Sequence, residues 1–317
     1  MRKVIIDCDP GIDDALAITL AIKSQKLDIL GLTICSGNVP AEIGAKNASR
    51  VLEICEDANI PVYIGEETPL VRKLITAQDT HGEDGLGEAY DMNYDSNRIK
   101  KGGVQFIIDT LKNNNDISII ALGPLTNIAM ALRQNKEVFN NLNSFVSMGG
   151  AFRIHGNCSP VAEFNYWVDP DAANEVYQNL PTKIHMVGLD VTRKIVLTPN
   201  IIELMHRIDT KMAKFVEDIT RFYIDFHWEY EKIIGCVIND PLAVAYFLDP
   251  SLCQTIESYV QVVTTGEAIG QSMVDSGNFY RKPSNAVIAV DVDSKRFMKT
   301  FLNTLFPHDE IEVEAYL

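Results

Sequence analysis

Short runs rich in valine and isoleucine recur along this chain, and stretches with the spacing of amphipathic helices separate them. A run that is apolar at successive positions belongs to a strand covered on both faces, as in a parallel sheet. Between two such runs, in the segment 41–56, apolar residues recur every three or four positions and so share one helix face. The alternation predicts an α/β fold, a doubly wound, mostly parallel sheet with helices on both faces. The runs expected to form strands are Val4–Ile6, Ile29–Ile34, Ile117–Leu122, Phe145–Met148, Ile184–Leu189, Tyr259–Val263 and Ala286–Val290.

The chain has no internal repeat, low-complexity tract or linker rich in proline and glycine, so we expect a single domain over residues 1–317. Two stretches interrupt the alternation of strands and helices. Residues 66–103 are rich in glycine and charge, and residues 199–238 have the pattern of two successive helices, the second with many aromatic residues. Long excursions from a compact sheet often act as lids or binding loops, so we expect both to border the functional site.

Charge and cysteine content exclude several classes of protein. A formal net charge of −15 without a basic patch repels phosphate backbones and argues against nucleic-acid binding. No stretch approaches the ~20 apolar residues of a membrane span, and the first apolar run is too short for a signal peptide. The six cysteines form no CxxC pair, and several follow isoleucine, as in Ile34-Cys35. We therefore expect free thiols in a reducing cytoplasm.

Four aspartates fall within eight residues at the end of the first expected strand, in the segment Asp7-Cys8-Asp9-Pro10-Gly11-Ile12-Asp13-Asp14-Ala15. In a low-dielectric crevice these carboxylates repel one another, so a cation is expected among them. Pro10-Gly11 predicts a tight turn, after which Asp13 and Asp14 open a helix whose dipole favours anions. Ligands that are all oxygen favour Ca²⁺ or Mg²⁺ over zinc. The alternative is a solvated acidic turn that only caps the helix.

Two other acidic motifs do not fit this segment. An EF-hand loop counted from Asp7 needs a glutamate at its twelfth position, where this chain has Ile18. A phosphatase of the DxD type needs a glycine and then a threonine after the second aspartate. This chain has Pro10 in place of that glycine, and Ile12 follows Gly11.

The aspartate segment resembles the signature of the inosine-uridine preferring nucleoside hydrolase family, and the similarity continues in order along nearly the whole chain. The resemblance implies a Rossmann-like fold of the nucleoside hydrolase type. It also implies an enzyme that hydrolyses the N-glycosidic bond of ribonucleosides to free base and ribose, as a homo-oligomer (a dimer or tetramer) in nucleoside salvage or catabolism. The other matching motifs are Ser36-Gly37-Asn38, Ala121–Asn127, Met148-Gly149-Gly150, Gly156-Asn157, Val161–Asn165, Gly188–Thr192 and Asn239-Asp240-Pro241.

The resemblance implies that Asp9, Asp14, Asp240 and the backbone carbonyl of Leu122 hold one Ca²⁺, with waters completing the shell. Three carboxylates, one carbonyl and waters suit the six to eight oxygen ligands that calcium takes. Asp7 would support this shell from behind. For Asp240 the alternative role is a helix cap, and both roles can hold at once.

Asp13 is the general base that the resemblance implies. A water on Ca²⁺ has a lowered pKa, and Asp13 would take its proton as the water attacks the anomeric carbon. The transition state would be a ribosyl oxocarbenium ion, whose positive charge the surrounding carboxylates stabilise.

The resemblance also implies a set of residues that grip the sugar. Met148 and Phe164 are expected to pack against the ribose, with core packing as their alternative role. Asp190 and Thr192 are expected to support the ion site. The implied ribose-binding residues, each with donors or acceptors for sugar hydroxyls, are Asn38, Asn157, Glu163 and Asn165.

One position departs from the family pattern. Many members that hydrolyse inosine and uridine have a histidine directly before the aspartate that corresponds to Asp240, whereas this chain has Asn239 there. We place Asn239 beside the substrate, but an amide cannot give a proton to the leaving base. A well-placed acid is worth ~10²–10⁴-fold in rate, so its loss needs compensation.

Three replacements for that acid are open. His81, in the glycine-rich excursion, could approach the base. Tyr223, His227 and Glu231 share one face of an expected helix and could deliver a proton or a hydrogen bond, while Trp228 stacks on the base. Alternatively, the substrate carries a base that leaves without a directly delivered proton.

Two other functions compete with nucleoside hydrolysis. One is an N-ribohydrolase of the same fold that acts on another N-riboside, such as nicotinamide riboside or a modified nucleoside. The other is a catalytically silent protein that binds calcium or ribose. Every metal and ribose position of the family pattern is filled in this chain, which favours an active hydrolase.

Overall fold

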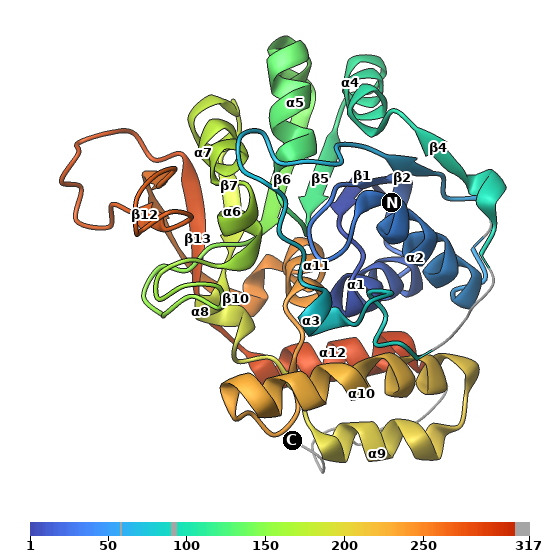
Figure 1. The fold of residues 1–317 in the computed structure, drawn as a ribbon. Helices are drawn as coiled ribbons and strands as arrows, with labels where there is room; N and C mark the ends of the chain where they lie inside the picture. Colours follow the sequence, from blue (N-terminus) through green and yellow to red (C-terminus); the bar gives the residue numbers. More distant parts are fainter. Residues whose placement is uncertain (58, 90–93, 308–317) are drawn as a thin grey trace.

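A nine-stranded sheet forms the centre of the molecule in the computed structural model, which describes residues 1–57, 59–89 and 94–307 (Figure 1). The strands lie in the order β10-β13-β7-β6-β5-β1-β2-β3-β4. All neighbours are parallel except β10 and β13. The predicted doubly wound, mostly parallel sheet is thus confirmed. The bounds are β1 (Arg2–Cys8), β2 (Leu27–Ile34), β3 (Val62–Ile64), β4 (Ile99–Lys101), β5 (Ile117–Ala121), β6 (Leu142–Met148), β7 (Ile184–Val187), β10 (Cys253–Ser258) and β13 (Ala286–Val292).

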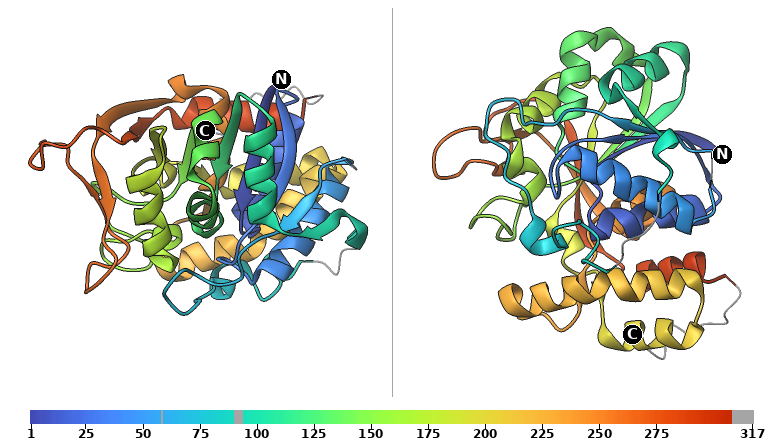
Figure 2. Two further views of the ribbon diagram at one scale, coloured as in Figure 1. Left: turned by 90° about the horizontal axis from the view of Figure 1, so that it is seen from above. Right: turned by 45° about the vertical axis from the view of Figure 1, so that its right-hand side comes forward.

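Helices cover both faces of this sheet because its central strands are apolar on both sides. In β1, Val4, Ile6 and Cys8 join one hydrophobic core, while Ile5 points to the other core. Figures 1 and 2 show the two layers of helices on opposite sides of the sheet. One layer comprises α1 (Ile12–Lys23), α2 (Ala41–Ile54), α11 (Asp240–Leu248) and α12 (Ser294–Leu305), and the other comprises α4 (Gly103–Asn113), α5 (Thr126–Gln134) and α7 (Pro170–Asn179).

Three strands of the sheet were not expected, and one expected strand lies elsewhere. The segments that form β3 and β4 have only three residues each, too few to show a pattern, and β10 is a half-exposed antiparallel edge. The run Tyr259–Val263 contains β11 (Val260–Val262), which among the described residues pairs only with β12 (Ser272–Val274). The apolar run therefore correctly predicted the strand β11, but it could not show that this strand lies in a separate two-stranded sheet.

The order of the strands reverses between β1 and β5. From β1 the chain moves outward through β2, β3 and β4, and it then returns to the other side of β1 with β5, β6 and β7. At such a switch point the loops diverge and leave a crevice at the carboxyl ends of the strands, where α/β proteins bind ligands. The aspartate segment follows β1, and Leu122 follows β5.

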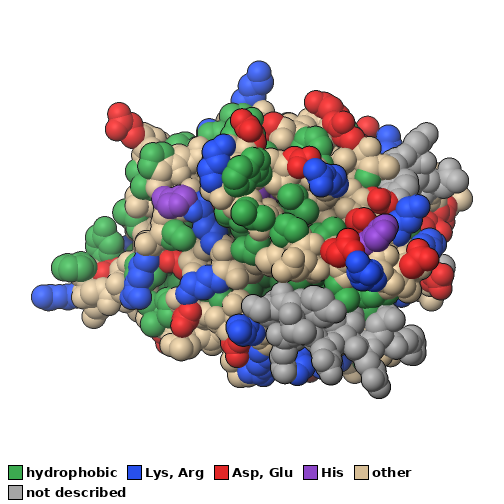
Figure 3. Space-filling model, turned by 90° about the horizontal axis from the view of Figure 1, so that it is seen from below, with side chains coloured by type: hydrophobic (Ala, Val, Ile, Leu, Met, Phe, Trp, Pro, Cys, Tyr) green, Lys and Arg blue, Asp and Glu red, His purple; other side chains and the backbone are tan. Residues whose placement is uncertain are grey.

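Each excursion contributes a helix near this crevice. The first contains α3 (Gln78–His81), and its residues 90–93 lie outside the described residues. The second contains α9 (Pro199–Ile208) and α10 (Lys211–Glu231), which lie beyond α12 at the bottom of Figure 1. Seen from that side, the surface has hydrophobic side chains at its centre with acidic and basic ones around them (Figure 3). Within the described residues, no helix combines the length and apolar character that crossing a membrane requires.

Candidate functional site

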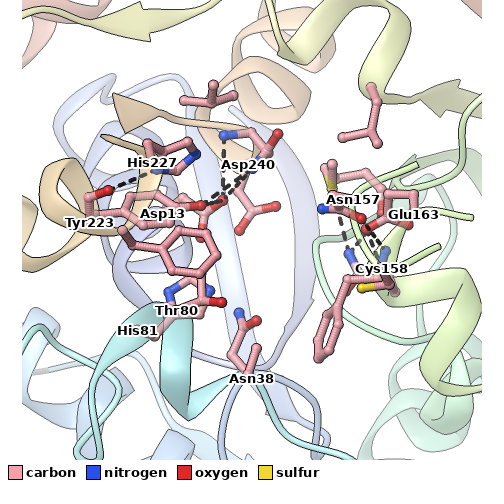
Figure 4. Close-up of a pocket in the computed structure, with 18 of the residues that line it drawn as sticks. Asp13, Asn38, Thr80, His81, Asn157, Cys158, Glu163, Tyr223, His227 and Asp240 are labelled. Carbon is pink, nitrogen blue, oxygen red and sulfur yellow. Dashed lines mark hydrogen bonds between the residues drawn. The ribbon is translucent and has the colours of Figure 1, made fainter. Parts of the chain in front are cut away.

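A pocket opens beyond the carboxyl ends of the strands, and it brings together most of the residues that the sequence singled out (Figure 4). The two excursions both reach it, the first through Thr80 and His81 and the second through α10. The singled-out residues that line it are Asp13, Asn38, His81, Leu122, Met148, Asn157, Glu163, Phe164, Asn165, Tyr223, His227, Glu231, Asn239 and Asp240.

The turn after β1 is held by its own side chains. Helix α1 begins at Ile12, and the Asp14 carboxylate accepts the backbone N–H groups of Asp9 at 3.2 Å and Gly11 at 3.0 Å. A Cβ atom at Gly11 would lie 2.7 Å from Nδ1 of His81 and 2.8 Å from Nδ2 of Asn38. A side chain at this position would have to displace His81 and Asn38, so the glycine lets the first excursion approach the turn closely.

Three carboxylates converge at the base of the pocket. One oxygen from each of Asp13, Asp14 and Asp240 lies within 4.8 Å of the others, and all three residues are buried. Burial and the neighbouring negative charges raise the pKa of Asp14 to about 6, and they also raise the pKa of Asp240. Such a cluster is stable as anions only around a positive charge.

Asp9 lies behind this cluster in a fitted cradle. It is fully buried, its Oδ2 accepts the Asn38 N–H at 2.6 Å, and its Oδ1 has no hydrogen-bond partner among the described residues. A side chain at Gly37 or Gly123 would collide with this carboxylate. An orphaned, buried carboxylate oxygen beside three further carboxylates fits a hard cation that prefers oxygen.

The carbonyl of Leu122 faces the pocket and is held there by Asn165, whose Nδ2 donates to it at 2.6 Å. A carbonyl oxygen has two lone pairs, so one stays available for a cation. Asp7 does not line the pocket. Its Oδ1 accepts hydrogen bonds from Thr33 at 2.5 Å and Asn127 at 2.8 Å, and burial raises its pKa to about 7.

Asp13 differs from the other aspartates in its partners. Its Oδ2 accepts Nδ2 of Asn239 at 3.0 Å, the Asn239 backbone N–H at 3.4 Å and the Tyr223 hydroxyl at 3.4 Å. The side chain thus links the carboxylate cluster to Tyr223 of α10 at the edge of the pocket (Figure 4). It is placed to exchange a proton with a molecule in the pocket.

The expected ribose-binding residues also serve the fold. Nδ2 of Asn38 donates to Asp14 at 3.0 Å, and the Asn157 Oδ1 accepts the Phe164 N–H at 2.9 Å. Glu163 caps α6 (Phe164–Val168) and also accepts the Gly150 N–H at 2.8 Å. Burial raises the pKa of Glu163 to about 7 despite these hydrogen bonds.

Two buried histidines present opposite tautomers to the pocket. The backbone N–H of Ile12 donates to Nδ1 of His81 at 3.1 Å, so in the neutral ring the proton is on Nε2. Nδ1 of His227 lies 2.8 Å from the carbonyl oxygen of Tyr223, which can only accept, so here Nδ1 carries the proton. Burial lowers the pKa of both rings. Only His227 can take a second proton without losing its backbone hydrogen bond.

Two expected contacts differ in the structure. Trp228 is 53% exposed and is absent from the pocket lining, because the next residue on a helix points about 100° away from His227. Asp190 does not support the carboxylates. Its two oxygens accept the N–H groups of Phe152 and Arg153, each at 2.7 Å, and so hold the loop after β6.

Arg193 and Phe226 also line the pocket and were not expected from the sequence. Arg193 donates to the Gly156 carbonyl and to Glu231, both at 3.2 Å, and so joins the loop after β6 to α10. Phe226 lies three residues after Tyr223, so helical periodicity could have placed it on the same face. For Arg193 the sequence carried no comparable signal.

Comparisons with known proteins agree on one family. The sequence model described as inosine-uridine preferring nucleoside hydrolase matches residues 4–299. The pyrimidine-specific ribonucleoside hydrolase RihB of Shigella flexneri serotype 5b is 35% identical over 300 residues, which cover 93% of this chain and 94% of that protein.

Solved structures agree with this match. The purine-preferring ribonucleoside hydrolase from Gardnerella vaginalis superposes with a TM-score of 0.90 at 32% identity, over 96% of this chain and 98% of that one. The plant nucleoside hydrolase PpNRh1 gives a TM-score of 0.89 at 32% identity over the same shares of the two chains. The similarity therefore extends over the sheet, the helices and the loops that line the pocket.

Proposed function

The chain belongs to the inosine-uridine preferring nucleoside hydrolase family and hydrolyses the N-glycosidic bond of ribonucleosides, and we propose that it uses a water activated by Asp13 beside a bound Ca²⁺. The family match confirms the resemblance drawn from the aspartate segment. The observation that carries the proposal is the convergence of Asp13, Asp14 and Asp240 within 4.8 Å at the base of the pocket. Carboxylates this close and this buried need a cation.

Asp9, Asp14, Asp240 and the carbonyl of Leu122 are the proposed ligands of the ion. The orphaned Oδ1 of Asp9 and the free lone pair of Leu122 support this assignment. A set made only of oxygen suits Ca²⁺. When bound, Ca²⁺ supplies a water of lowered pKa and neutralises the carboxylates.

Asp13 receives the proton of the attacking water, because it combines a place at the edge of the pocket with hydrogen bonds that keep its Oδ2 in position. As the base departs, positive charge develops on the ribosyl group. Asp240 and Glu163, which both line the pocket, stabilise that charge. Asn38, Asn157 and Asn165 line the pocket, and their polar atoms that remain free of protein partners are the proposed contacts for the sugar hydroxyls, with Met148 and Phe164 against the ring.

His227 is the proposed acid for the leaving base. Its Nδ1 is committed to the Tyr223 carbonyl, so an added proton must sit on Nε2, on the opposite side of the ring. His81 has its Nδ1 occupied by the Ile12 N–H, so it donates a hydrogen bond through Nε2 without serving as the acid. Tyr223 and Glu231 complete the face of α10 that borders the base.

The proposal includes a cytoplasmic location. All six cysteines are free, and four of them are buried, which supports the expected reducing cytoplasm. A homo-oligomer and a role in nucleoside salvage or catabolism rest on the family resemblance.

Release of reducing sugar tests the proposed function. The purified chain is incubated with inosine, uridine, adenosine and cytidine, with and without a calcium chelator. The panel spans purines and pyrimidines because the matched relatives are described as pyrimidine-specific and as purine-preferring. We expect release from at least one nucleoside, its loss in chelator and its return with added Ca²⁺. No release from any nucleoside would favour another N-riboside as substrate, or a silent binding protein.

A further inference from the structure

Asn239 lines the pocket directly before Asp240, and its amide is turned toward Asp13. Nδ2 donates to the Asp13 Oδ2 at 3.0 Å and lies 3.5 Å from the Tyr223 hydroxyl, and the Asn239 backbone N–H also reaches Oδ2 at 3.4 Å. One residue thus gives the carboxylate two donors, one from its side chain and one from its main chain.

Chemistry sets the orientation of this amide. A carboxylate accepts hydrogen bonds only, so the NH₂ group must face Asp13 and the Oδ1 of Asn239 must point away. That Oδ1 is buried and has no partner among the described residues. Leaving a buried acceptor unpaired is destabilising. The hydrogen bond to Asp13 therefore fixes the orientation of the Asn239 amide, although this orientation leaves Oδ1 without a partner.

The partners of Asp13 are distributed unequally between its two oxygens. Oδ2 has three donors, from the side chain and backbone of Asn239 and from Tyr223, whereas no described residue donates to Oδ1. The three donors fix the plane of the carboxylate and leave Oδ1 free for a water or an ion.

We propose that Asn239 is a positioning residue for the general base, which holds Asp13 so that Oδ1 meets the attacking water. This inference rests on the proposed role of Asp13 as that base. In this role Asn239 acts on the activation of the attacking water and not on the departure of the base. A histidine at this position could play the same part, since its Nδ1–H lies as many bonds from the backbone as Nδ2 of asparagine.

Three substitutions at this position test the proposal. Asn239→Ala removes the side-chain donor, Asn239→Asp keeps the size but replaces the donor with a charge, and Asn239→His restores an N–H donor. Each variant is assayed with a natural nucleoside, whose base needs a proton to leave, and with p-nitrophenyl riboside, whose leaving group needs none. Calcium affinity by calorimetry and the melting temperature accompany the kinetics.

We expect kcat of Asn239→Ala and Asn239→Asp to fall by about 10–10²-fold on both substrates alike, with KM and calcium affinity changed less than about threefold. The kcat of Asn239→His should be much closer to that of the unmodified enzyme than the kcat of the other two variants. Asn239→His should also raise or broaden activity on inosine. Asn285→Ala is the matched control, because Asn285 donates to the Tyr177 and Val260 carbonyls outside the pocket. That variant should lower the melting temperature and leave kcat unchanged.

Three results would overturn the inference. A loss confined to the natural nucleoside would place Asn239 on the leaving base. A parallel loss of calcium affinity would make it a support for the ion site. If the unmodified enzyme hydrolysed neither substrate, the proposed function itself would fail, and the positioning role would fall with it.

Discussion

The wall of the pocket that carries the carboxylates is centred on one turn, whereas the wall that carries the histidines brings together residues of the two excursions. In the first, the ion wall (Asp9, Asp13, Asp14, Leu122 and Asp240), Asp14 bonds to two N–H groups of its own turn. In the second, the base wall (His81, Tyr223, Phe226, His227 and Glu231), Arg193 ties α10 to the loop at Gly156.

This difference indicates which changes each wall tolerates. A carboxylate that bonds the backbone of its own turn cannot be replaced without disturbing its neighbours, so the ion wall is a unit. The pocket face of α10 belongs to a helix outside the sheet, so we expect single changes there to disturb the carboxylates less, with Tyr223 as the exception because it is buried and bonds Asp13. The predictions below test the division, beginning with the ion wall.

Asp14→Asn should have the largest effect. It removes a negative charge from the cluster, and the stabilisation that a bound cation provides is worth several kcal/mol, so turnover should fall at least ~10³-fold. Calcium should raise the melting temperature of the unmodified chain but not that of the variant. Asp9→Asn should behave in the same way.

Asp169→Asn provides the control for both variants. Asp169 is also fully buried, but it caps α7 outside the pocket. This variant should melt earlier and still respond to calcium. Near-normal turnover of Asp9→Asn or Asp14→Asn in chelator would contradict a calcium mechanism.

Asp13→Asn tests whether Asp13 acts as the general base or as a ligand of the ion. The amide keeps the shape but accepts no proton, so kcat should fall at least ~10²-fold. Calcium affinity and the inhibition constant of ribose should change much less. If turnover and calcium affinity fell together, Asp13 would be a ligand, and the base would have to be sought elsewhere.

His227→Ala should slow natural nucleosides by about 10²-fold and spare p-nitrophenyl riboside, because only the former need a proton on the base. Burial lowers the pKa of His227, against the opposing effects of the Tyr223 carbonyl and Glu231. Since the charged ring is the acid, the rate ratio of nucleoside to nitrophenyl substrate should fall as the pH rises through this pKa. In the variant the ratio should stay flat.

His206→Ala is the matched control for that experiment, since His206 lies on α9 with its side chain 67% exposed. It should change neither rate. Equal slowing of both substrates by His227→Ala would show that His227 is not the leaving-group acid, and the hydrogen bond that Nε2–H of His81 can donate to the base would be tested next.

Arg193→Gln should have the smallest effect. It removes the link from the loop at Gly156 to Glu231, a contribution of about 1 kcal/mol, so KM for nucleosides should rise about fivefold while kcat changes little. Steady-state kinetics with a natural nucleoside would measure both constants. A loss of kcat without a change in KM would mean that Arg193 acts on the chemical step, and the base wall would then be less adaptable than we infer.

The ion wall was largely predictable from the sequence, because its central part is local. Asp9, Asp13 and Asp14 lie within six residues, and the tight turn and helix start between them follow from Pro10-Gly11. The central strands were predictable for a similar reason, since a strand buried on both faces must be apolar throughout. The three-residue strands β3 and β4 were not predicted, because their conformation depends on pairing with β2 and with each other.

The base wall depends on contacts that no local pattern encodes. Helical periodicity placed Tyr223 and His227 on one face of α10 and Trp228 on another, but only the packing of α10 decided which face borders the pocket. The tautomers of the histidines follow from which backbone group each ring meets, and for His81 that group is the N–H of Ile12, 69 residues away. The amide of Asn239 meets Asp13 across 226 residues. The sequence by itself determined the chemistry available, because residue types and short-range turns are written in it. Only the tertiary structure decided which donor meets which acceptor, because hydrogen bonds depend on distances that folding alone sets.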